Sequence, residues 1–232
     1  MEQMLYRFDF HTHSFFSADA SSKPEQMVAA AKSRGLNGIA ITDHDTCRAM
    51  DYCLRKGMMR EDGLPVEDFL IIPGVEISTA DGHLLCIGTT LPDRKGVPAV
   101  QVADEIRTHG GIPIPPHPFD RWRAGIRADV MDKMNLDVVE VFNAAVSRRS
   151  YNQRARAYAE QRSLRMMAGS DAHYPTAIGT CWTSLELETL SVANVLKQLP
   201  QATQIEERYL TFFEGIKKKF GNWFRIFNKQ AP

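Results

Sequence analysis

The chain has 232 residues, 44% of them hydrophobic, and its 28 Lys and Arg residues balance 28 Asp and Glu residues. A chain of this length and apolar content is expected to bury a large core as one globular domain. The formal net charge of zero excludes a global field toward nucleic acid or an anionic membrane, and no apolar run approaches the roughly 18 residues of a membrane span.

Cysteine usage and the first residues bear on the cellular compartment. The chain has four cysteines, at positions 47, 53, 86 and 181. Only Cys47 and Cys53 are close, and six residues apart on an expected helix suits neither a disulfide framework nor a zinc knuckle. Residues 1–8 include Glu and Arg and lack the apolar stretch of a signal peptide. We therefore expect reduced thiols in a cytoplasmic protein.

Hydrophobic periodicity and turn residues divide the chain into alternating strands and helices. In chain order we expect strands at 5–10, 38–41, 69–75, 83–88, 111–115, 137–142 and 164–168, with another inside 178–187. The expected helices cover 24–35, 47–58, 97–108, 129–134, 148–161 and 190–199, and the first is opened by Pro24 with Ser22 as its cap. This alternation predicts an α/β protein of β-α repeats with parallel strands.

Residues able to do chemistry gather where the first three strands end. The first strand runs into His11-Thr12-His13, whose two imidazoles share one face because side chains alternate along a strand. The second ends in Thr-Asp-His-Asp at 42–45, which contains His44, and the third ends in Glu76, a carboxylate that needs a partner if it is buried. Taken alone, an HxH pair is more often two histidines satisfied at a strand end than a metal site.

The later strands repeat the pattern. His83 begins the fourth strand, and His117 is bracketed by two prolines, which stiffen the backbone and expose the ring. Asp171 and His173 follow the strand at 164–168 and lie two residues apart, so they point to the same side. A carboxylate and an imidazole that converge on one point suit a divalent metal ion.

The strand-end clusters are expected to act together. Parallel strands of a β-α protein place their functional groups at the carboxyl ends, so these side chains should meet at one mouth. Structural zinc sites lean on cysteine, and these clusters contain none. The pattern therefore favours a hydrolytic site with two or three divalent ions, and imidazole with carboxylate suits Zn, Mn or Fe. Among the histidines only His109, at a helix end, looks ordinary.

The same motifs in the same order resemble the polymerase and histidinol phosphatase (PHP) family. They are HxH at 11–13, TDHD at 42–45, PGVEIS at 73–78, GHLL at 82–85, HP at 117–118 and GSDAH at 169–173. The resemblance covers roughly residues 5 to 190. It implies a distorted, TIM-like (β/α)7 barrel and a phosphoesterase site with two or three metal ions.

Carried over motif by motif, the resemblance implies eight metal ligands: His11, His13, His44, Glu76, His83, His117, Asp171 and His173. Asp19 is a ninth candidate. Many relatives continue the first motif as HxHxxxSDG, whereas here Ala18 follows Ser17 and the acid comes one place later.

The resemblance departs from the nucleotide- and RNA-directed relatives at one place. Those relatives carry a sizeable insertion between the GHLL-like histidine and the HP histidine. Here His83 and His117 stand 34 positions apart, and a helix and a strand are expected between them. We therefore expect a single-domain form without an inserted cap.

The implied reaction is hydrolysis of a phosphomonoester, nucleotide or 5′-phosphorylated oligonucleotide by a metal-bridged hydroxide, because cations lower the pKa of bound water from 15.7 to about 7. Asp43, beside His44, is the candidate for orienting a ligand or carrying a proton. Arg121 is the candidate for clamping the phosphate, with Arg123 and Arg127 as alternatives. The expected partner is a small phosphorylated substrate, and nucleic acid is expected only as a substrate.

Two other functions fit the first motif. An amidohydrolase-type enzyme that cleaves C–N bonds also begins with HxH on its first strand, but this chain has no lysine at a mid-chain strand end and finishes on Asp-x-His rather than a lone Asp. A non-catalytic metal-binding module of the PHP type is the other alternative. Such modules usually lose ligands, and this chain keeps nearly all of them.

The expected domain organisation is a metal-binding barrel at 1–190, on which a helical tail at 191–232 packs as part of the same domain. The tail is basic and aromatic from Lys217 to Phe227. We interpret it as a last helix whose aromatic residues pack on the barrel while the lysines stay in water; contact with an anionic membrane surface or a partner is the alternative.

Overall fold

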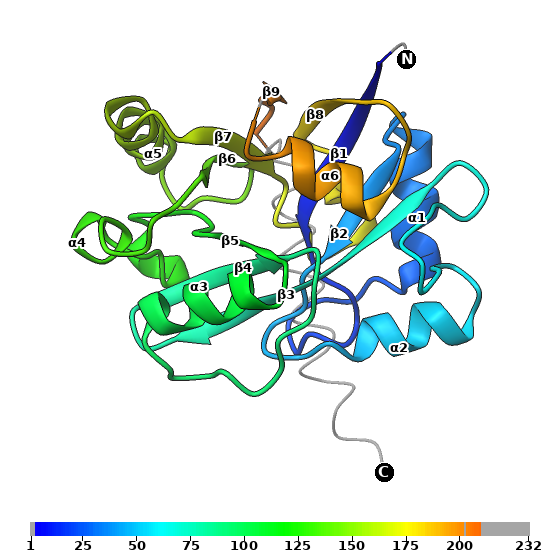
Figure 1. Ribbon diagram of the computed structural model, residues 1–232, viewed down its shortest axis with the longest axis horizontal. Coiled ribbons are helices and arrows are strands. Elements are labelled where there is room, and N and C mark those ends of the chain that lie inside the picture. The colour runs from blue at the N-terminus through cyan, green and yellow to red at the C-terminus, as the bar shows by residue number, and fades with distance from the viewer. Residues whose placement is uncertain (1–2, 202, 210–232) are drawn as a thin grey trace.

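A computed structural model describes residues 3–201 and 203–209 of the chain. Helices and strands alternate along it, and helices lie around a curved sheet (Figure 1). The strands are β1 (Met4–Thr12), β2 (Gly38–Ile41), β3 (Leu70–Thr79), β4 (Gly82–Ile87), β5 (Ile112–Ile114), β6 (Val138–Asn143), β7 (Arg165–Gly169), β8 (Trp182–Leu187) and β9 (Gln204–Glu206). The helices are α1 (Pro24–Ser33), α2 (Arg48–Arg55), α3 (Ala99–Thr108), α4 (Ala128–Met131), α5 (Arg149–Arg162) and α6 (Val192–Gln198), with 3-10 turns η1 (Arg121–Arg123) and η2 (Pro175–Ala177).

Seven strands form one mixed sheet in the order β5-β4-β3-β2-β1-β8-β9. The central strands β1, β2 and β3 are parallel, and β2 is buried at all four residues, as expected for a parallel strand that is covered on both faces. The pairs β3-β4, β4-β5, β1-β8 and β8-β9 are antiparallel. The expectation of uniformly parallel strands is therefore wrong for the outer part of the sheet.

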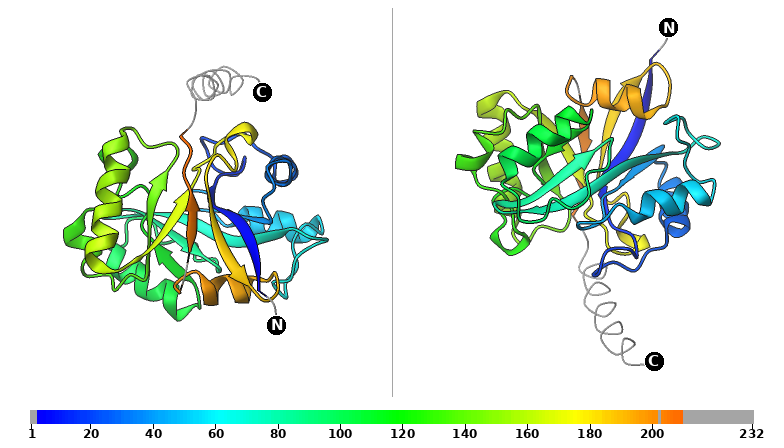
Figure 2. Two further views of the ribbon diagram at one scale, coloured as in Figure 1. Left: turned by 90° about the horizontal axis from the view of Figure 1, so that it is seen from above. Right: turned by 60° about the horizontal axis from the view of Figure 1, so that its bottom comes forward.

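The remaining strands, β6 and β7, form a separate parallel pair. It touches the large sheet through few backbone bonds. On one side Glu140 N donates to Pro115 O at 3.3 Å, and on the other Asp171 N donates to His11 O and His13 N donates to Ala172 O, both at 2.8 Å. These bonds do not extend into ladders. The described residues thus form a curled half-barrel with a two-stranded sheet beside it, whose curvature is visible in Figure 2, and not the full (β/α)7 barrel that we expected.

The departure from a regular barrel has a local cause. β3 and β4 are joined by the tight turn at 80–81, with Thr79 paired to Gly82, so no crossover helix separates them and the two strands must run antiparallel. β5 then pairs antiparallel to β4 after α3. The expectation of parallel strands is wrong here because a hairpin, and not a crossover helix, joins β3 to β4.

The apolar side chains of β2 point alternately to the two faces of the sheet and so belong to different core clusters. Ile39 and Ile41 of β2 pack with residues of α1 and α2, whereas Ala40 between them belongs to the cluster that β1, β3, β4 and β5 fill. α3 and α5 pack with β6 in a third cluster that includes Val102, Ile106 and Val139. Helices on the outside and apolar side chains within leave the strand ends to carry polar groups.

The start of α1, the cysteines and the segment after β8 were also predicted from the sequence. α1 begins after Lys23, whose N–H is capped by Gln26 Oε1 at 3.0 Å, so the expected Ser22 cap is wrong. All four cysteines are free thiols, as expected. The helix expected at 190–199 is α6, but most of the tail beyond it, including residues 217–227, lies outside the described residues. Within the described ranges no helix is both long and apolar enough to cross a bilayer.

Candidate metal centre

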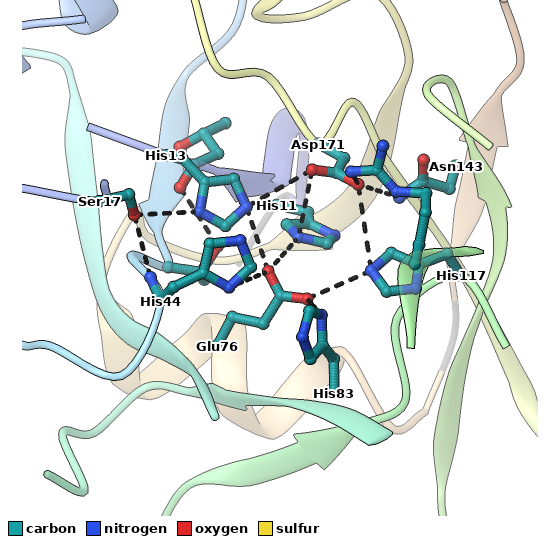
Figure 3. A network of polar contacts seen from close by, with 12 residues as sticks. His11, His13, Ser17, His44, Glu76, His83, His117, Asn143 and Asp171 are labelled. Carbon is teal, nitrogen blue, oxygen red and sulfur yellow. Dashed lines mark hydrogen bonds and ion pairs between the residues drawn. The ribbon is translucent and has the colours of Figure 1, made fainter. Parts of the chain in front are cut away.

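The structure brings all nine ligand candidates into one cluster. They come from β1 and the loop after it, from the segment after β2, from β3 and β4, and from the segments that follow β5 and β7. Figure 3 labels all of them except Asp19 and His173. Their donor atoms are linked by a chain of contacts between imidazoles and carboxylates. The cluster consists of His11, His13, Asp19, His44, Glu76, His83, His117, Asp171 and His173.

Glu76 is the centre of the cluster. It lies inside β3, not at its end as expected, and its side chain is buried. Five imidazole nitrogens approach its two oxygens. Oε2 lies 3.0 Å from His11 Nε2, 3.1 Å from His13 Nε2 and 3.5 Å from His44 Nδ1. Oε1 lies 2.8 Å from His83 Nδ1 and 3.2 Å from His117 Nε2.

The charge balance around Glu76 explains its ionisation. Burial alone would raise the pKa of this carboxyl, but the neighbouring imidazoles of His44, His11 and His83 hold it well below its ordinary value. A carboxylate that stays ionised among imidazoles can bridge two cations. Glu76 therefore has the charge and the position of a bridging metal ligand.

Two further carboxylates lie at the edges of the cluster. Asp171 Oδ1 lies 3.4 Å from His173 Nδ1 and 3.5 Å from His13 Nε2. Asp19 Oδ2 lies 3.0 Å from His173 Nε2 and 3.6 Å from His44 Nε2. The one-residue displacement of Asp19 in the first motif therefore does not remove its carboxylate from the cluster.

The cluster is closed at its base and accessible on one side. The side chains of His11 and His13 are fully buried. The side chains of His44, His83 and Asp19 are 25%, 20% and 47% exposed. A ligand from solvent would thus approach from the side where Asp19, His44 and His83 lie.

Four triads of donor atoms could each hold an ion, with the atoms of a triad within 4.8 Å of one another. The triads overlap, because His11, His13, His44 and Glu76 each take part in two. They are His13-His44-His173, His11-Glu76-His117, His11-His13-Asp171 and His44-Glu76-His83. Such overlap is what neighbouring ions that share ligands require.

Unpaired atoms test whether these residues fit metal ions. Four buried atoms have no hydrogen-bond partner among the described residues: His13 Nε2, His83 Nδ1, His117 Nδ1 and Asp171 Oδ1. His13 Nε2 and His83 Nδ1 do lie near Glu76, but without the geometry of a hydrogen bond. Buried polar atoms left unpaired are costly. Nitrogen and oxygen donors that converge without partners fit a metal centre.

The protonation of two imidazoles agrees with this fit. Burial lowers the pKa of His44 to about 4, and it lowers the pKa of His117 as well. Both rings are therefore neutral near pH 7, and a neutral imidazole is the form that binds a metal. His13 behaves differently: burial would lower its pKa, but Asp171 and Glu76 raise it to about 9.

Two ligand candidates have unusual backbones. Asp171 has φ = 53° and His117 has φ = 32°, a left-handed conformation that non-glycine residues rarely adopt. His117 N is fixed by a 2.6 Å bond to Glu140 Oε2, and Asp171 N by its bond to His11 O. A strained backbone persists only where surrounding contacts maintain it. Such residues are concentrated at functional sites.

The phosphate-clamp expectation for Arg121 is not supported by its position. Arg121 is exposed in η1, whereas Arg123, two residues later, is half-buried and its Nη2 donates to Asp171 Oδ2. Arg123 Nη1 also donates to Ala145 O at 3.2 Å, and its Nε is buried without a partner. The backbone conformation of η1 decides which arginine faces inward. The sequence of so short a turn does not predict that conformation. Arg127 is exposed and lies 3.6 Å from Asp129.

Asp43 lies behind the cluster, not in it. Its Oδ1 accepts from Ser14 N and Ser17 Oγ, both at 2.7 Å, and its Oδ2 accepts from Ser14 Oγ at 2.5 Å. Ser17 Oγ in turn lies 3.4 Å from His13 Nδ1 and accepts from His44 N at 2.9 Å. Of the two roles expected for Asp43, this placement favours orientation of the histidines over proton transfer.

Sequence reasoning missed two residues of β6. Glu140 Oε1 lies 3.1 Å from His11 Nδ1, and Asn143 Nδ2 donates to Asp171 Oδ2 at 3.2 Å. Both side chains are buried. The signal was a lone Glu inside the apolar run Val-Val-Glu-Val-Phe at 138–142, because a carboxylate in a buried strand needs a specific partner.

Comparisons with known proteins agree with this arrangement. The family model for the PHP-associated region matches residues 149–203. The uncharacterized protein MJ1587 of Methanocaldococcus jannaschii is 30% identical over 146 residues, which cover 59% of this chain and 81% of that protein. The chain belongs to the PHP family.

Three solved structures share the fold at low identity. PsfC from Pseudomonas syringae is 19% identical with a TM-score of 0.73, over 96% of this chain and 99% of its own. The lesion-specific endonuclease Q of Pyrococcus furiosus is 19% identical with a TM-score of 0.67, and 87% of this chain matches 58% of it. A protein of Bifidobacterium adolescentis described as a metal-dependent phosphoesterase is 18% identical with a TM-score of 0.55, over 73% of this chain and 88% of its own.

Proposed function

We propose that the protein is a metal-dependent phosphoesterase whose metal centre is the cluster around Glu76. The observation that carries the proposal is the convergence of five imidazoles on this one buried carboxylate, with Arg123 paired to Asp171 at the edge of the same cluster. The donors are nitrogen and oxygen only, which suits Zn, Mn or Fe. The nine clustered residues would hold two or three such ions.

The residues have separable tasks in this proposal. Bound divalent ions supply a nucleophilic water and neutralise phosphoryl charge. Glu76 and Asp171 bring negative charge that holds cations together, and the buried rings of His11 and His13 exclude solvent from the base of the site. Arg123 keeps a guanidinium charge beside Asp171, where a phosphate oxygen can accept its N–H donors in a planar fork.

The related structures support the same class of reaction. Endonuclease Q acts on DNA carrying lesions and has been seen with a duplex that contains an abasic lesion, and the Bifidobacterium protein is described as a phosphoesterase. These proteins are 17–19% identical to this chain and share its fold, and the proposed reaction belongs to the same class as theirs.

The size of the substrate follows from the segment between His83 and His117. After β4, it contains only α3 and β5 before His117, so no further domain lies there. With Asp19, His44 and His83 partly exposed, we infer an open site that accepts small phosphomonoesters, nucleotides or the 5′-phosphate of an oligonucleotide. The substrate would then be selected by little more than its phosphate.

An activity panel tests the proposal. Protein reconstituted with Mn²⁺ is assayed with p-nitrophenyl phosphate, its bis ester, histidinol phosphate, nucleotides and short RNA, beside a dihydroorotase-type assay. We expect turnover of simple monoesters, abolished in Asp171→Asn and kept in His109→Ala, since the ring of His109 contacts the carbonyl of Glu105 in α3 and is not part of the cluster. Turnover in the C–N assay alone would establish an amidohydrolase, and a metal-loaded protein inert to every ester would establish a binding module.

A further inference from the structure

A buried carboxylate outside the proposed ligand set contacts one of the two fully buried histidines of the cluster. His11 is fully buried, with Nε2 directed at Glu76 Oε2 at 3.0 Å and Nδ1 directed at Glu140 Oε1 at 3.1 Å. A histidine can bind a metal through one nitrogen while the other donates to a carboxylate, and that second bond selects the tautomer. Glu140 thus contacts the ring nitrogen of His11 that is not directed at Glu76.

The second oxygen of Glu140 also accepts hydrogen bonds. Oε2 accepts from the backbone N–H of His117 at 2.6 Å and from Asn143 Nδ2 at 3.0 Å. The His117 bond fixes a backbone with φ = 32°. One carboxylate of β6 therefore holds the ring of one ligand and the backbone of another.

Asn143 connects this carboxylate to Asp171. Its Nδ2 donates to Glu140 Oε2 and also to Asp171 Oδ2 at 3.2 Å, so both amide hydrogens are used. Its Oδ1 accepts from Ala145 N at 2.9 Å, which fixes which end of the amide is which. Asp171 Oδ2 is thereby occupied by Asn143 and Arg123, while Asp171 Oδ1 remains unpaired and faces His13 and His173.

The contact between Glu140 and His11 requires a glycine in the neighbouring strand. Gly169 of β7 pairs with Asn143 of β6, and a Cβ built on it would overlap Glu140 Oε1 and lie only 2.6 Å from His11 Cβ. An alanine at this position must therefore push Glu140 and His11 apart. This provides a second way to break the contact without removing the carboxylate.

We propose that Glu140 and Asn143 are positioning residues of the metal centre: Glu140 fixes His11 with Nε2 toward the ions, and Asn143 fixes Asp171 so that only Oδ1 faces them. The inference rests on the proposed function only in treating the cluster as a metal centre. Two residues of a single strand thus set the orientation of three ligands, His11, His117 and Asp171, that other segments supply.

The substitution Glu140→Gln is a sharp test because an amide cannot replace this carboxylate. If its oxygen faces His11, its NH₂ faces the N–H of His117 and the NH₂ of Asn143, and donors oppose donors. If its NH₂ faces His11, Nδ1 must accept, the proton moves to Nε2, and that nitrogen cannot bind a metal. Either arrangement disturbs the centre with almost no change in volume.

The experiment measures metal binding directly. Wild type, Glu140→Gln, Asn143→Ala and Gly169→Ala are titrated with Mn²⁺ by equilibrium dialysis with elemental analysis, and their Co²⁺ absorption spectra are compared. The matched control is Glu186→Gln, the same change at an exposed position of β8. We expect the β6 and β7 variants to bind at least one ion about 10- to 100-fold more weakly, with a changed cobalt spectrum, and the control to match wild type.

The outcomes separate this inference from the proposed function. Unchanged affinities and cobalt spectra in both Glu140→Gln and Gly169→Ala overturn it, even if their melting temperatures fall. If Glu140→Gln does not fold, Gly169→Ala and Asn143→Ala decide in the same way. A wild-type protein that binds metal but hydrolyses no phosphate ester overturns the proposed function alone, whereas one that binds no metal overturns both.

Discussion

Arg123 and Asp171 are 48 residues apart in the chain, and the guanidinium of one donates to the carboxylate of the other. Burial would lower the pKa of Arg123, but Asp171 and Glu76 raise it above its ordinary value, so the guanidinium stays charged. Burial likewise would raise the pKa of Asp171, but Arg123 and His11 hold it well below its usual range. The pair places a permanent cation next to a proposed metal ligand.

This relationship predicts which arginine binds the phosphate. We expect Arg123→Ala to lower kcat/KM for phosphomonoesters by about 10- to 100-fold, because a hydrogen bond to a charged group contributes about 1.5–3 kcal/mol. Arg123→Lys should recover only part, since lysine lacks the fork of donors. Arg121→Ala, at the exposed position of the same turn, is the matched control and should match wild type.

Metal content must be determined for each of these variants, because Arg123 contacts Asp171 and a lost ion would imitate a lost phosphate contact. Wild-type kcat/KM in fully loaded Arg123→Ala protein would remove the role from Arg123.

The orientation of the arginines is a feature of the site that the sequence does not predict. A loop with Arg121, Arg123 and Arg127 after a histidine indicates a cation near the mouth, but only the three-dimensional turn decides which side chain points inward. Glu140 was missed for a related reason. Strand-end motifs are local patterns, whereas the partner of a lone mid-strand carboxylate, here His11, comes from 129 residues away.

The positions of helices and strands were predictable from the sequence, whereas the direction of the strands was not. Helices and strands were found because each has its own periodicity, and helix α5, expected at 148–161, is Arg149–Arg162. Strand direction was not, because the β-α alternation predicts parallel strands, whereas the short turn at 80–81 joins β3 and β4 as an antiparallel hairpin. The nine ligand candidates nevertheless converge, although Glu76 lies inside β3 and not at its end as predicted.

Metal content is the most direct prediction for the ligand candidates. Asp171 and His173 take part in triads with His11, His13 and His44. We expect the double variant Asp171→Ala/His173→Ala to lose at least one of two or more bound ions by elemental analysis after Mn²⁺ reconstitution. His109→Ala serves as the control for removal of a histidine outside the cluster. Retention of every ion in the double variant would contradict the assignment.

Two imidazoles give the metal-free protein opposite responses to pH. The pKa of His13 in the folded protein is about 9, above its unfolded value of about 6.5, so its stabilisation is fully present below pH of about 6.5 and is lost as the pH rises through 9. The pKa of His44 in the folded protein is about 4, below the unfolded value, so this residue destabilises the fold as the pH falls from about 6.5 toward 4.

We therefore expect the melting temperature of chelator-treated protein to be highest near pH of about 6.5 and to fall toward pH 9. Saturating Mn²⁺ should remove the alkaline decline, because metal binding needs neutral imidazoles and competes less with protons as the pH rises. Circular dichroism melts across pH 5–9 with and without metal measure both curves. Parallel curves at all pH values would show that these imidazoles do not bind the ion.

Activity should fall steeply below pH of roughly 6 and be partly restored by added metal.

Asp43 offers a test between two roles that the sequence leaves open. Its carboxylate is 1% exposed, and its oxygens accept three hydrogen bonds from Ser14 and Ser17. A group enclosed in this way cannot exchange protons with solvent without breaking those bonds. Ser17 connects it to His13 Nδ1 and to the backbone of His44, so its effect should reach the site through the placement of those two ligands.

We expect Asp43→Asn to weaken metal binding, because a neutral amide oxygen accepts more weakly than a carboxylate from Ser14 N and Ser17 Oγ, which loosens the loop that carries Ser17. The affinity for Mn²⁺ should fall about tenfold or more, as it does when partners of metal ligands are removed. Ser17→Ala removes the connecting hydroxyl alone and should shift the affinity in the same direction by less. At saturating metal, the pH dependence of kcat in Asp43→Asn should keep the shape of wild type. Loss of one limb of that profile with metal affinity unchanged would instead make Asp43 the proton carrier.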